Sequence, residues 1–514
     1  MRTVTGPTDH VVVVGAGLAG LATTLHLLGA GRCVTVVERG ARPGGRAGRH
    51  EMAGYHVDTG PTVLTMPELV EEAFAAVGDH LADRLDLVRL DPAYRAQFAD
   101  GSSIDVHTDA DAMEAEVRAV AGPAEAAGYL RLREWLTRLY RAEMGRFIGG
   151  NFDSSLDLVA SPAAVRDLFR LARIGGFGRL APQVGRFLTD ERLQRIFSFQ
   201  ALYAGVPPQR ALAAYAVIAY MDTVAGVYFP RGGMHALPQA LADAAADAGA
   251  AFRYGAEVTG LERTGDRITA VRTADGERVG ADAVVLTPDL PVVHRLLGRA
   301  PRRPVGLRWS PSAVVLHAGV RPGTTGGWPD LAHHTISFGG AWERTFDEII
   351  RTGHLMSDPS LLVTRPTATD PSLAPDGREL LFVLAPCPNL RTAPLDWDAV
   401  GPAYRDEIVG VLERRGLRGL GDAIEAEHLV TPADWAAQGL AAGTPFSAAH
   451  TFAQTGPFRT RNLVRGLDNV VLAGCGTTPG VGVPTVLLSG KLAADRITAR
   501  RRARLLTAGS RTGH

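Results

Sequence analysis

The sequence predicts an α/β protein with a discontinuous, Rossmann-like nucleotide-binding domain, a second domain built on a mixed sheet, and a helical insert. Three observations support this fold class. A strand, a glycine-rich turn and a helix open the chain over residues 11–31. A similar strand, loop and helix occur near its end, over residues 469–497. Between them, apolar residues return at helical spacing over 135–148. When two segments far apart in sequence form one domain, the residues between them form the other parts of the protein.

Length and composition narrow the range of functions. With 514 residues the chain is too long for one hydrophobic core, so two or three domains are expected. A formal net charge of zero argues against nucleic acid as the main partner. The three cysteines are scattered without C-x-x-C spacing, so we expect a reducing compartment and no cysteine-built metal site. The polar N-terminus has no signal-peptide pattern, so we expect a cytoplasmic protein without a membrane span.

The first motif has the order of a dinucleotide-binding βαβ unit. A β-branched run at 11–14 leads into GAGLAG at 15–20 and an amphipathic helix. A second apolar strand, 33–37, ends at Glu38. A pyrophosphate is expected at the helix N-terminus, where free N–H groups favour an anion. Glu38 is placed to accept hydrogen bonds from ribose hydroxyls.

The three glycines of this turn have separate expected roles. Gly15 permits the tight turn, and Gly17 lets the backbone approach the pyrophosphate. Gly20 lets the helix pack close to the strand. A turn used only for packing would not require all of these parts in this order.

A second glycine pair separates FAD from NAD. Gly44, Gly45 and Arg46 follow the acidic strand end, as in flavoproteins of the amine-oxidase type. A loop without side chains lets backbone approach the FAD phosphates, and Arg46 can hold an anionic oxygen. A glycine-rich surface loop is the alternative, but beside Glu38 the flavin interpretation is favoured. The sequence therefore predicts FAD as the cofactor.

Later segments are expected to return to the same cofactor. Gly60 and Pro61 form a rigid loop that could lie against the flavin ring, and Val258 could pack on adenine or be a simple core residue. The C-terminal loop is almost bare of side chains. Its expected contributions come from Gly474, Gly482 and Val483, with the helix start from about residue 484 facing a carbonyl oxygen of the reduced flavin.

The sequence resembles the bacterial and fungal type of phytoene desaturase, an FAD-dependent family of carotenoid oxidoreductases. The resemblance covers nearly the whole chain and includes segments that belong to no general nucleotide-binding motif. Its motifs are GAGLAGL (15–21), ERGARPGGRAG (38–48), DTGPTVLTMP (58–67), FPRGGMHALP (229–238), AHHTISFGGAWERTFDEI (332–349), APCPNL (385–390) and GCGTTPGVGVPTVLLSGK (474–491). Thr478 stands where many members have His, which leaves a role for that imidazole in doubt.

The resemblance implies a two-domain fold of the amine-oxidase and GDI type and a reaction. Double bonds would be introduced into a C40 polyene such as phytoene, with hydride passing to the flavin and a proton lost from the neighbouring carbon. Quinone or O2 would accept the electrons. Three alternatives stay open: a related carotenoid flavoenzyme (later-step desaturase, isomerase or ketolase), a non-redox GDI-like binding protein, and an amine oxidase.

The expected domain boundaries follow from the positions of these segments along the chain. The FAD-binding domain takes residues 8–85, 226–295 and 465–500, and the substrate domain takes 86–134 and 296–464. The helical insert, 135–225, combines aromatic residues with seven arginines between 166 and 195. A basic amphipathic surface of this kind would suit peripheral contact with acidic lipid. A buried helical subdomain with solvated arginines is the alternative.

Catalytic side chains are not identified by any motif. His334, in the pair 333–334, could lie beside the flavin as a proton acceptor, and Asp153 in the insert could do the same. Each is more often an ordinary polar residue, and the reaction could proceed without a protein base.

Overall fold

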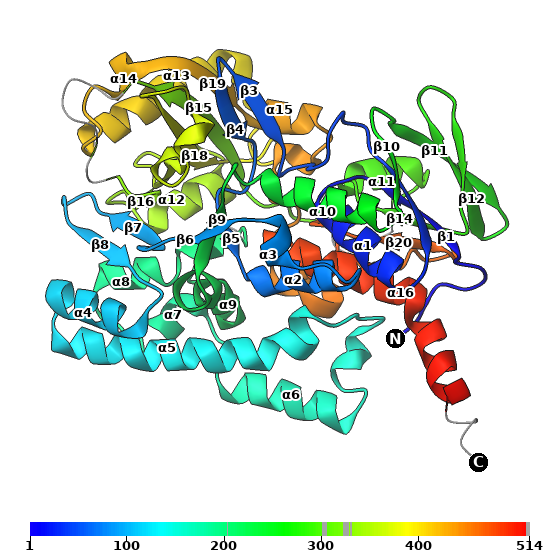
Figure 1. Ribbon diagram of the computed structural model, residues 1–514. Helices are drawn as coiled ribbons and strands as arrows, with labels where there is room; N and C mark the ends of the chain where they lie inside the picture. The colour runs from blue at the N-terminus through cyan, green and yellow to red at the C-terminus, as the bar shows by residue number, and fades with distance from the viewer. Residues whose placement is uncertain (203, 301–305, 322–327, 329–330, 510–514) are drawn as a thin grey trace.

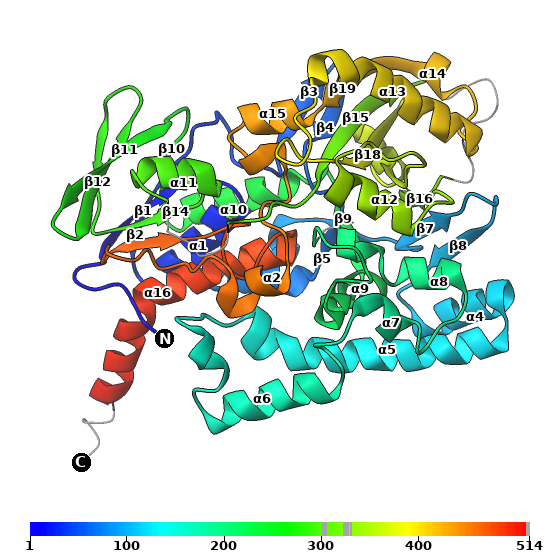
Figure 2. The same cartoon turned by 180° about the vertical axis from the view of Figure 1, so that it is seen from behind.

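The computed structural model describes residues 1–202, 204–300, 306–321, 328 and 331–509, with side chains up to residue 499. Figure 1 shows three parts: a parallel sheet wrapped by helices, a second large sheet, and a helical layer along one side. Seen from behind, in Figure 2, the first and last long helices, α1 and α16, lie together against the parallel sheet.

The parallel sheet collects strands from distant parts of the chain. Its order is β10-β2-β1-β14-β20, and every neighbouring pair is parallel. The strands are β1 (His10–Val14), β2 (Cys33–Val37), β10 (Ala251–Arg253), β14 (Ala283–Leu286) and β20 (Val470–Leu472). Because both faces are covered, β1 and β14 are continuous apolar runs rather than alternating ones.

Three helices cover this sheet: α1 (Leu18–Gly29), α10 (Ala236–Asp247) and α16 (Val483–Gly509). Helices α1 and α16 touch at backbone distance. A Cβ on Gly490 would overlap the carbonyl oxygen of Ala19, and the Thr23 hydroxyl donates to the carbonyls of both residues. The two ends of the polypeptide thus form one packed unit.

A small antiparallel sheet flanks the parallel one, with order β11-β12-β13. Its strands are β11 (Val258–Thr264), β12 (Arg267–Thr273) and β13 (Arg278–Gly280). The chain changes direction between β10 and β11. Gly255 has a φ of +66° and turns the chain, so β10 joins the parallel sheet and β11 starts the antiparallel one.

The second large sheet is mixed, with order β19-β15-β18-β17-β16-β7-β8. Only β16 and β7 pair in parallel. The strands are β7 (Tyr94–Gln97), β8 (Ser103–Val106), β15 (Ser312–Val320), β16 (His334–Ser337), β17 (Leu361–Thr364), β18 (Glu379–Cys387) and β19 (Ile424–Val430). Helix α13 (Trp397–Arg414) packs on it through Trp397, Tyr404 and Ile408.

Short strands and helices connect the large sheets. The strands are β3 (Arg49–Met52), β4 (Tyr55–Asp58), β5 (Leu64–Thr65), β6 (Leu87–Arg89) and β9 (Val227–Pro230). The helices are α2 (Pro67–Ala75), α3 (Leu81–Arg84), α11 (Leu290–Leu296), α12 (Glu343–Asp347), α14 (Leu420–Ala423) and α15 (Pro432–Ala437).

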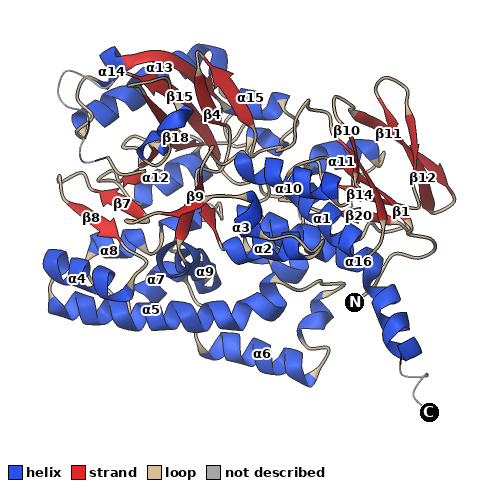
Figure 3. Ribbon diagram, viewed as in Figure 1, coloured by secondary structure: helices blue, strands red, loops and turns tan. Residues whose placement is uncertain are grey.

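The helical layer forms one side of the molecule, as Figure 3 shows. It contains α4 (Ala110–Ala121), α5 (Pro123–Glu143), α6 (Pro162–Arg173), α7 (Leu180–Val184), α8 (Glu191–Ile196) and α9 (Ala216–Tyr220). Helix α5 runs without a break through the expected boundary between 134 and 135. Its residues Trp135, Leu136 and Leu139 are buried core.

Two α-helices of this layer pass directly into a π-helical turn. Helix α5 continues as η1 (Met144–Ile148), and α9 continues as η5 (Met221–Ala225). Within the described part of the chain, no helix combines the length and apolarity that a membrane crossing requires.

Candidate functional site: a dinucleotide cradle that opens onto an apolar corridor

A cavity of about 1400 Å3 starts at the carboxyl ends of β1 and β2 and ends between α6 and residues 452–458. The carboxyl edge of an open parallel sheet is where nucleotide ligands bind in such folds. The cavity has two parts of different character, a glycine-rich cradle at the sheet and an apolar corridor beyond it.

The glycines of the first turn divide between packing and space for a ligand. A Cβ on Gly20 would overlap the carbonyl oxygen of Gly15, so this position must be bare for helix and strand to meet. A Cβ on Gly17 would find its nearest atoms, in Gly44 and Gly45, at 3.9 Å. The space at Gly17 is therefore left free by the protein, and Gly17 lines the cavity.

Glu38 is held at the edge of the cradle. Its side-chain oxygens accept hydrogen bonds of 2.7 Å from the backbone N–H groups of Ala16 and Gly40. These bonds orient the carboxylate and leave lone pairs for hydroxyl groups of a ligand. Val258 is buried and lines the same end of the cavity beside Glu257.

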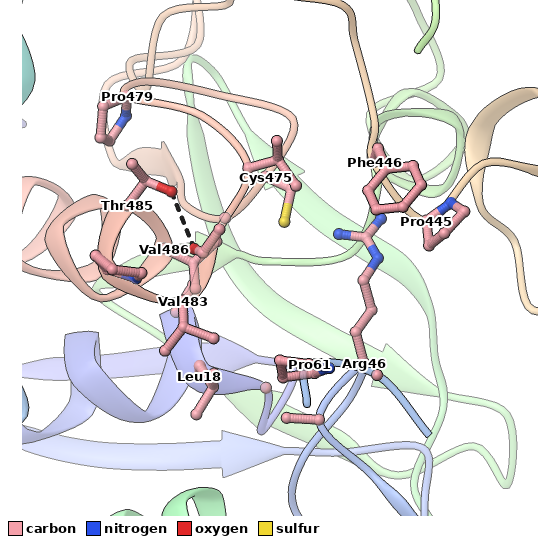
Figure 4. Close-up of a pocket in the computed structure, with 18 of the residues that line it drawn as sticks. Leu18, Arg46, Pro61, Pro445, Phe446, Cys475, Pro479, Val483, Thr485 and Val486 are labelled. Atoms are coloured by element: carbon pink, nitrogen blue, oxygen red, sulfur yellow. Dashed lines mark hydrogen bonds between the residues drawn. The ribbon is translucent and has the colours of Figure 1, made fainter. Parts of the chain in front are cut away.

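The second glycine pair closes the cradle from the other side. Gly44 donates to the carbonyl of Ala16 (2.9 Å), and its φ of +131° favours glycine. Arg46, at the end of this loop, points into the cavity toward Phe446 in Figure 4. Its Nε and one terminal nitrogen are buried without a hydrogen-bond partner, and the nearest carboxylate oxygen, of Asp289, is 3.5 Å away.

Two further loops complete the cradle. A Cβ on Gly60 would overlap the carbonyl oxygen of Arg46, and Pro61 lies beside that arginine in Figure 4. In the C-terminal loop, Gly474 and Gly482 have φ of +105° and +122°, and α16 starts at Val483, one residue before the expected position. All of these residues line the cavity.

The cradle fits FAD. Two buried nitrogens of Arg46 make no hydrogen bond, and the ion pair with Asp289 is long at 3.5 Å, so an anionic group of a ligand would satisfy these donors. The bare backbone at Gly17 and the free N–H groups at the start of α1 suit a pyrophosphate.

The corridor beyond the cradle has mostly apolar walls. Among its side chains are Phe199, Val217, Leu362, Phe382, Leu384 and Trp435. Both large sheets and the helical layer therefore contribute to one enclosure. A long hydrocarbon would be protected from water there.

Polar side chains also line this corridor, among them Glu143, Tyr215, Asp222, His334 and His450. The sequence interpretation anticipated His334 as a candidate and missed the other four. Burial raises the pKa of Asp222 to about 7 and that of Glu143 well above its ordinary value. Burial lowers the pKa of His334 to about 4 and that of His450 well below its usual range.

The two catalytic candidates end up in different places. His334 lines the corridor, and its Nδ1 lies 3.0 Å from the hydroxyl of Thr364. Asp153 is absent from the cavity wall. Its carboxylate accepts a 2.6 Å hydrogen bond from Arg496 and lies near the N-terminal amine of Met1. Asp153 thus ties the helical layer to α16, a structural position.

A glycine cradle for an FAD-sized dinucleotide, facing a water-excluding cavity, defines an oxidoreductase of the flavin type. The family model "Flavin containing amine oxidoreductase" matches residues 18–498. The chain is 71% identical over 506 residues to a phytoene dehydrogenase from Streptomyces griseus, covering 98% of each chain. It is 37% identical to a zeta-carotene-forming phytoene desaturase from Myxococcus xanthus, covering 95% of this chain and 93% of that one.

The chain belongs to the phytoene desaturase family of flavin-containing oxidoreductases. Its fold is shared more widely. An oxidoreductase from Methanosarcina mazei superimposes with a TM-score of 0.59 at 15% identity, covering 94% of this chain and 99% of that one. The expected family, the amine-oxidase-type fold and FAD as cofactor are confirmed. Among the described residues, no group of three or more His, Cys, Asp or Glu side chains could hold a metal ion.

Proposed function

We propose that this protein is an FAD-dependent carotenoid desaturase that introduces conjugated double bonds into phytoene or a related C40 polyene. The observation that carries the proposal is the apolar corridor, which joins the cradle to an opening between α6 and residues 452–458. When bound, FAD supplies an acceptor for hydride. The protein supplies the enclosure, which orients an apolar chain and excludes water.

We propose that the cradle residues anticipated from the sequence hold the FAD. Gly17 and the α1 N-terminus would face the pyrophosphate, Glu38 the ribose, and Val258 the adenine. Arg46 would pair with an anionic oxygen of the cofactor. The cavity-lining members of this set are Gly15, Gly17, Glu38, Gly44, Gly45, Arg46, Gly60, Pro61, Val258, Gly474, Gly482 and Val483. Gly20, which was also expected there, would act only through the packing of α1 against the turn.

The alternatives differ in what they require of the same cavity. A non-redox, GDI-like binding protein would have no need for a dinucleotide cradle into which Arg46 directs two buried nitrogens without hydrogen bonds. A later-step desaturase, isomerase or ketolase would use the same cradle and corridor, so product analysis must separate these. Quinone or O2 is the proposed acceptor of the electrons.

The test is anaerobic incubation of flavin-loaded protein with phytoene in liposomes. We expect the flavin absorbance to bleach while longer-wavelength polyene bands appear, in proportion to each other. Readmitting O2 or a quinone should restore the oxidised flavin. Unchanged flavin absorbance with phytoene, but bleaching with a more unsaturated carotenoid, would assign the protein to a later step instead.

We also propose peripheral contact with a membrane, through an exposed apolar surface at the corridor opening. This mouth patch has large apolar side chains that are 41–71% exposed: Leu156, Val159, Val165, Phe169, Phe177, Phe452 and Phe458. Phe177, Phe452 and Phe458 also line the cavity. A lipid-dissolved substrate could pass from bilayer to corridor there without crossing water.

The basic residues of the insert divide into two groups. Arg166, Arg170, Arg173 and Arg179 are exposed on or next to α6, beside the mouth patch, and could contact anionic headgroups. Arg195, in contrast, is buried and donates to the carbonyls of Gly339 and Gly340. The proposed lipid surface is therefore narrower than the insert as a whole.

A pair of charge insertions tests the mouth patch. Val165→Asp with Phe169→Asp should abolish binding to vesicles of anionic phospholipid, measured by co-sedimentation. The control is Leu130→Asp, because Leu130 is 43% exposed on α5 outside the patch. Equal sedimentation of both variants would contradict membrane contact at the corridor opening.

A further inference from the structure

Glu143 is an unusual residue in the apolar corridor. Its side chain lines the cavity and is only 4% exposed, and its Oε1 has no hydrogen-bond partner. A buried carboxyl group without a partner costs free energy that a hydrocarbon side chain in its place would not. Because the buried Glu143 carboxyl group does not stabilise the fold, we look for a chemical role that explains its presence in the corridor.

The local backbone presents Glu143 to the corridor. It is the last residue of α5, and the chain then passes into the π-helical turn η1. Single π-turns within helices redirect side chains and are frequent at functional sites. Phe147 and Ile148 of the same turn line the cavity, so the carboxyl group sits among the apolar side chains that would hold a polyene.

The surroundings connect Glu143 to the cofactor end of the cavity. Glu143, Tyr215 and His450 all line the cavity. Burial is the main cause of the raised pKa of Tyr215, and the charge of Glu143 adds a smaller contribution in the same direction. The ring of Tyr215 packs edge-on against His450 at 5.5 Å. A Cβ on Gly480 would overlap that imidazole, so His450 touches the C-terminal cradle loop. The cavity wall therefore includes both Glu143 and a side chain that touches the loop expected at the flavin.

We propose that the Glu143 carboxylate is the catalytic residue that accepts the proton lost by the polyene in each desaturation. This inference rests on the proposed function. One C–H bond breaks with its electron pair, and the hydride leaves to the bound flavin. The C–H bond on the neighbouring carbon breaks heterolytically, its proton forms an O–H bond on Glu143, and its electron pair becomes the new C=C bond.

The other polar groups of the corridor suit this role less. Burial lowers the pKa of His334 to about 4, which makes its imidazole a weak proton acceptor. His450 is affected in the same direction. Burial raises the pKa of Glu143, and a carboxylate of raised pKa is a stronger base than an exposed one. Burial also raises the pKa of Asp222, on η5, but only to about 7, and the Gln200 side chain offsets part of that increase.

The experiment compares Glu143→Gln and Glu143→Leu with wild type in anaerobic single turnovers on phytoene in liposomes. Both variants should keep full flavin content and phytoene binding, while flavin reduction slows about 100-fold or more, as for loss of a general base. Glu143→Asp should recover part of the rate. Glu143→Leu should also melt at a higher temperature than wild type, because it removes an unpaired buried polar group.

The matched control is Glu134→Gln, since Glu134 lies on the same helix with a 68% exposed side chain paired to Arg138. It should reduce its flavin at the wild-type rate. Flavin reduction in Glu143→Gln within threefold of wild type would overturn the assignment of Glu143 and leave the proposed function standing. Wild-type protein that does not reduce its flavin with phytoene, or with any carotenoid, would overturn both.

Discussion

The cradle and the corridor are two halves of one cavity, built by opposite means. The cradle consists of backbone: glycines at Gly15, Gly17 and Gly44, oriented N–H groups, and one arginine without a hydrogen-bonding partner. The corridor consists largely of side chains from the mixed sheet and the helical layer, with a few buried polar groups among them. The cradle recognises a charged cofactor through fixed dipoles, whereas the corridor holds an apolar chain by excluding water.

The difference concerns tolerance to change. A cradle glycine is either needed for packing or leaves space for the ligand. Each substitution there should therefore abolish either folding or cofactor binding. A corridor side chain is one of many in contact with the substrate, so most substitutions there should shift affinity gradually. The exceptions are buried ionisable groups, whose cost to the fold must be offset by function.

The largest expected effects separate the two kinds of glycine in the cradle. Gly20→Val should prevent folding, because its side chain would overlap the carbonyl oxygen of Gly15. Gly17→Val should fold, because 3.9 Å separates its Cβ from the nearest atoms, yet it should carry no FAD. Thermal unfolding and the ratio of flavin to protein measure the two effects. A flavin-loaded Gly17→Val variant would refute the assignment of the pyrophosphate site.

A smaller effect is expected for the arginine of the cradle. Arg46→Gln removes a cation with two buried nitrogens that make no hydrogen bond in the protein. Loss of one charge-assisted hydrogen bond costs roughly 1.5–3 kcal/mol, so FAD affinity should fall about 10- to 100-fold. Flavin titration of the apoprotein measures this. Arg405→Gln, which breaks a surface ion pair with Glu427, should leave FAD affinity unchanged.

A further effect, on the pH dependence of stability rather than on FAD binding, tests the corridor side of the comparison. Burial raises the pKa of Asp222 from 3.8 to about 7 in the folded protein. Between these values the unfolded chain loses its proton first, so the contribution of Asp222 to stability falls as pH rises. Asp222→Asn does not titrate. Its stability relative to wild type should therefore grow by on the order of 4 kcal/mol from about pH 4 to about pH 8.

Chemical denaturation of both proteins across this pH range measures the difference. A constant offset between Asp222→Asn and wild type would mean that Asp222 is solvated rather than enclosed by the corridor.

The residues expected in the cradle, Gly20 excepted, line one cavity, and they could be named because each cradle motif is a short segment with its own local signal. Glycine spacing, strand order and Glu38 are local signals, and each has a direct physical reason. The mixed sheet was expected only as a class, because strands such as β7 and β16 pair across more than two hundred residues. Motifs do not encode such pairing.

The polar groups of the corridor had no such signal. Glu143 ends a long helix rich in charged residues, and by sequence it resembles the solvent-exposed Glu134 of the same helix. Asp153 looked equally suited to catalysis, yet the tertiary structure pairs it with Arg496. Long-range packing determines the environment of each carboxyl group, because it sets how much water reaches the group.

By itself the sequence determined the cofactor, the family and the architecture of the cradle, because backbone geometry near glycines depends on neighbours in the chain. Only the tertiary structure decided which side chains face the substrate and which of them are denied a partner. The reason is that desolvation is a property of the folded interior, where segments distant in sequence enclose one carboxyl group and leave another in water.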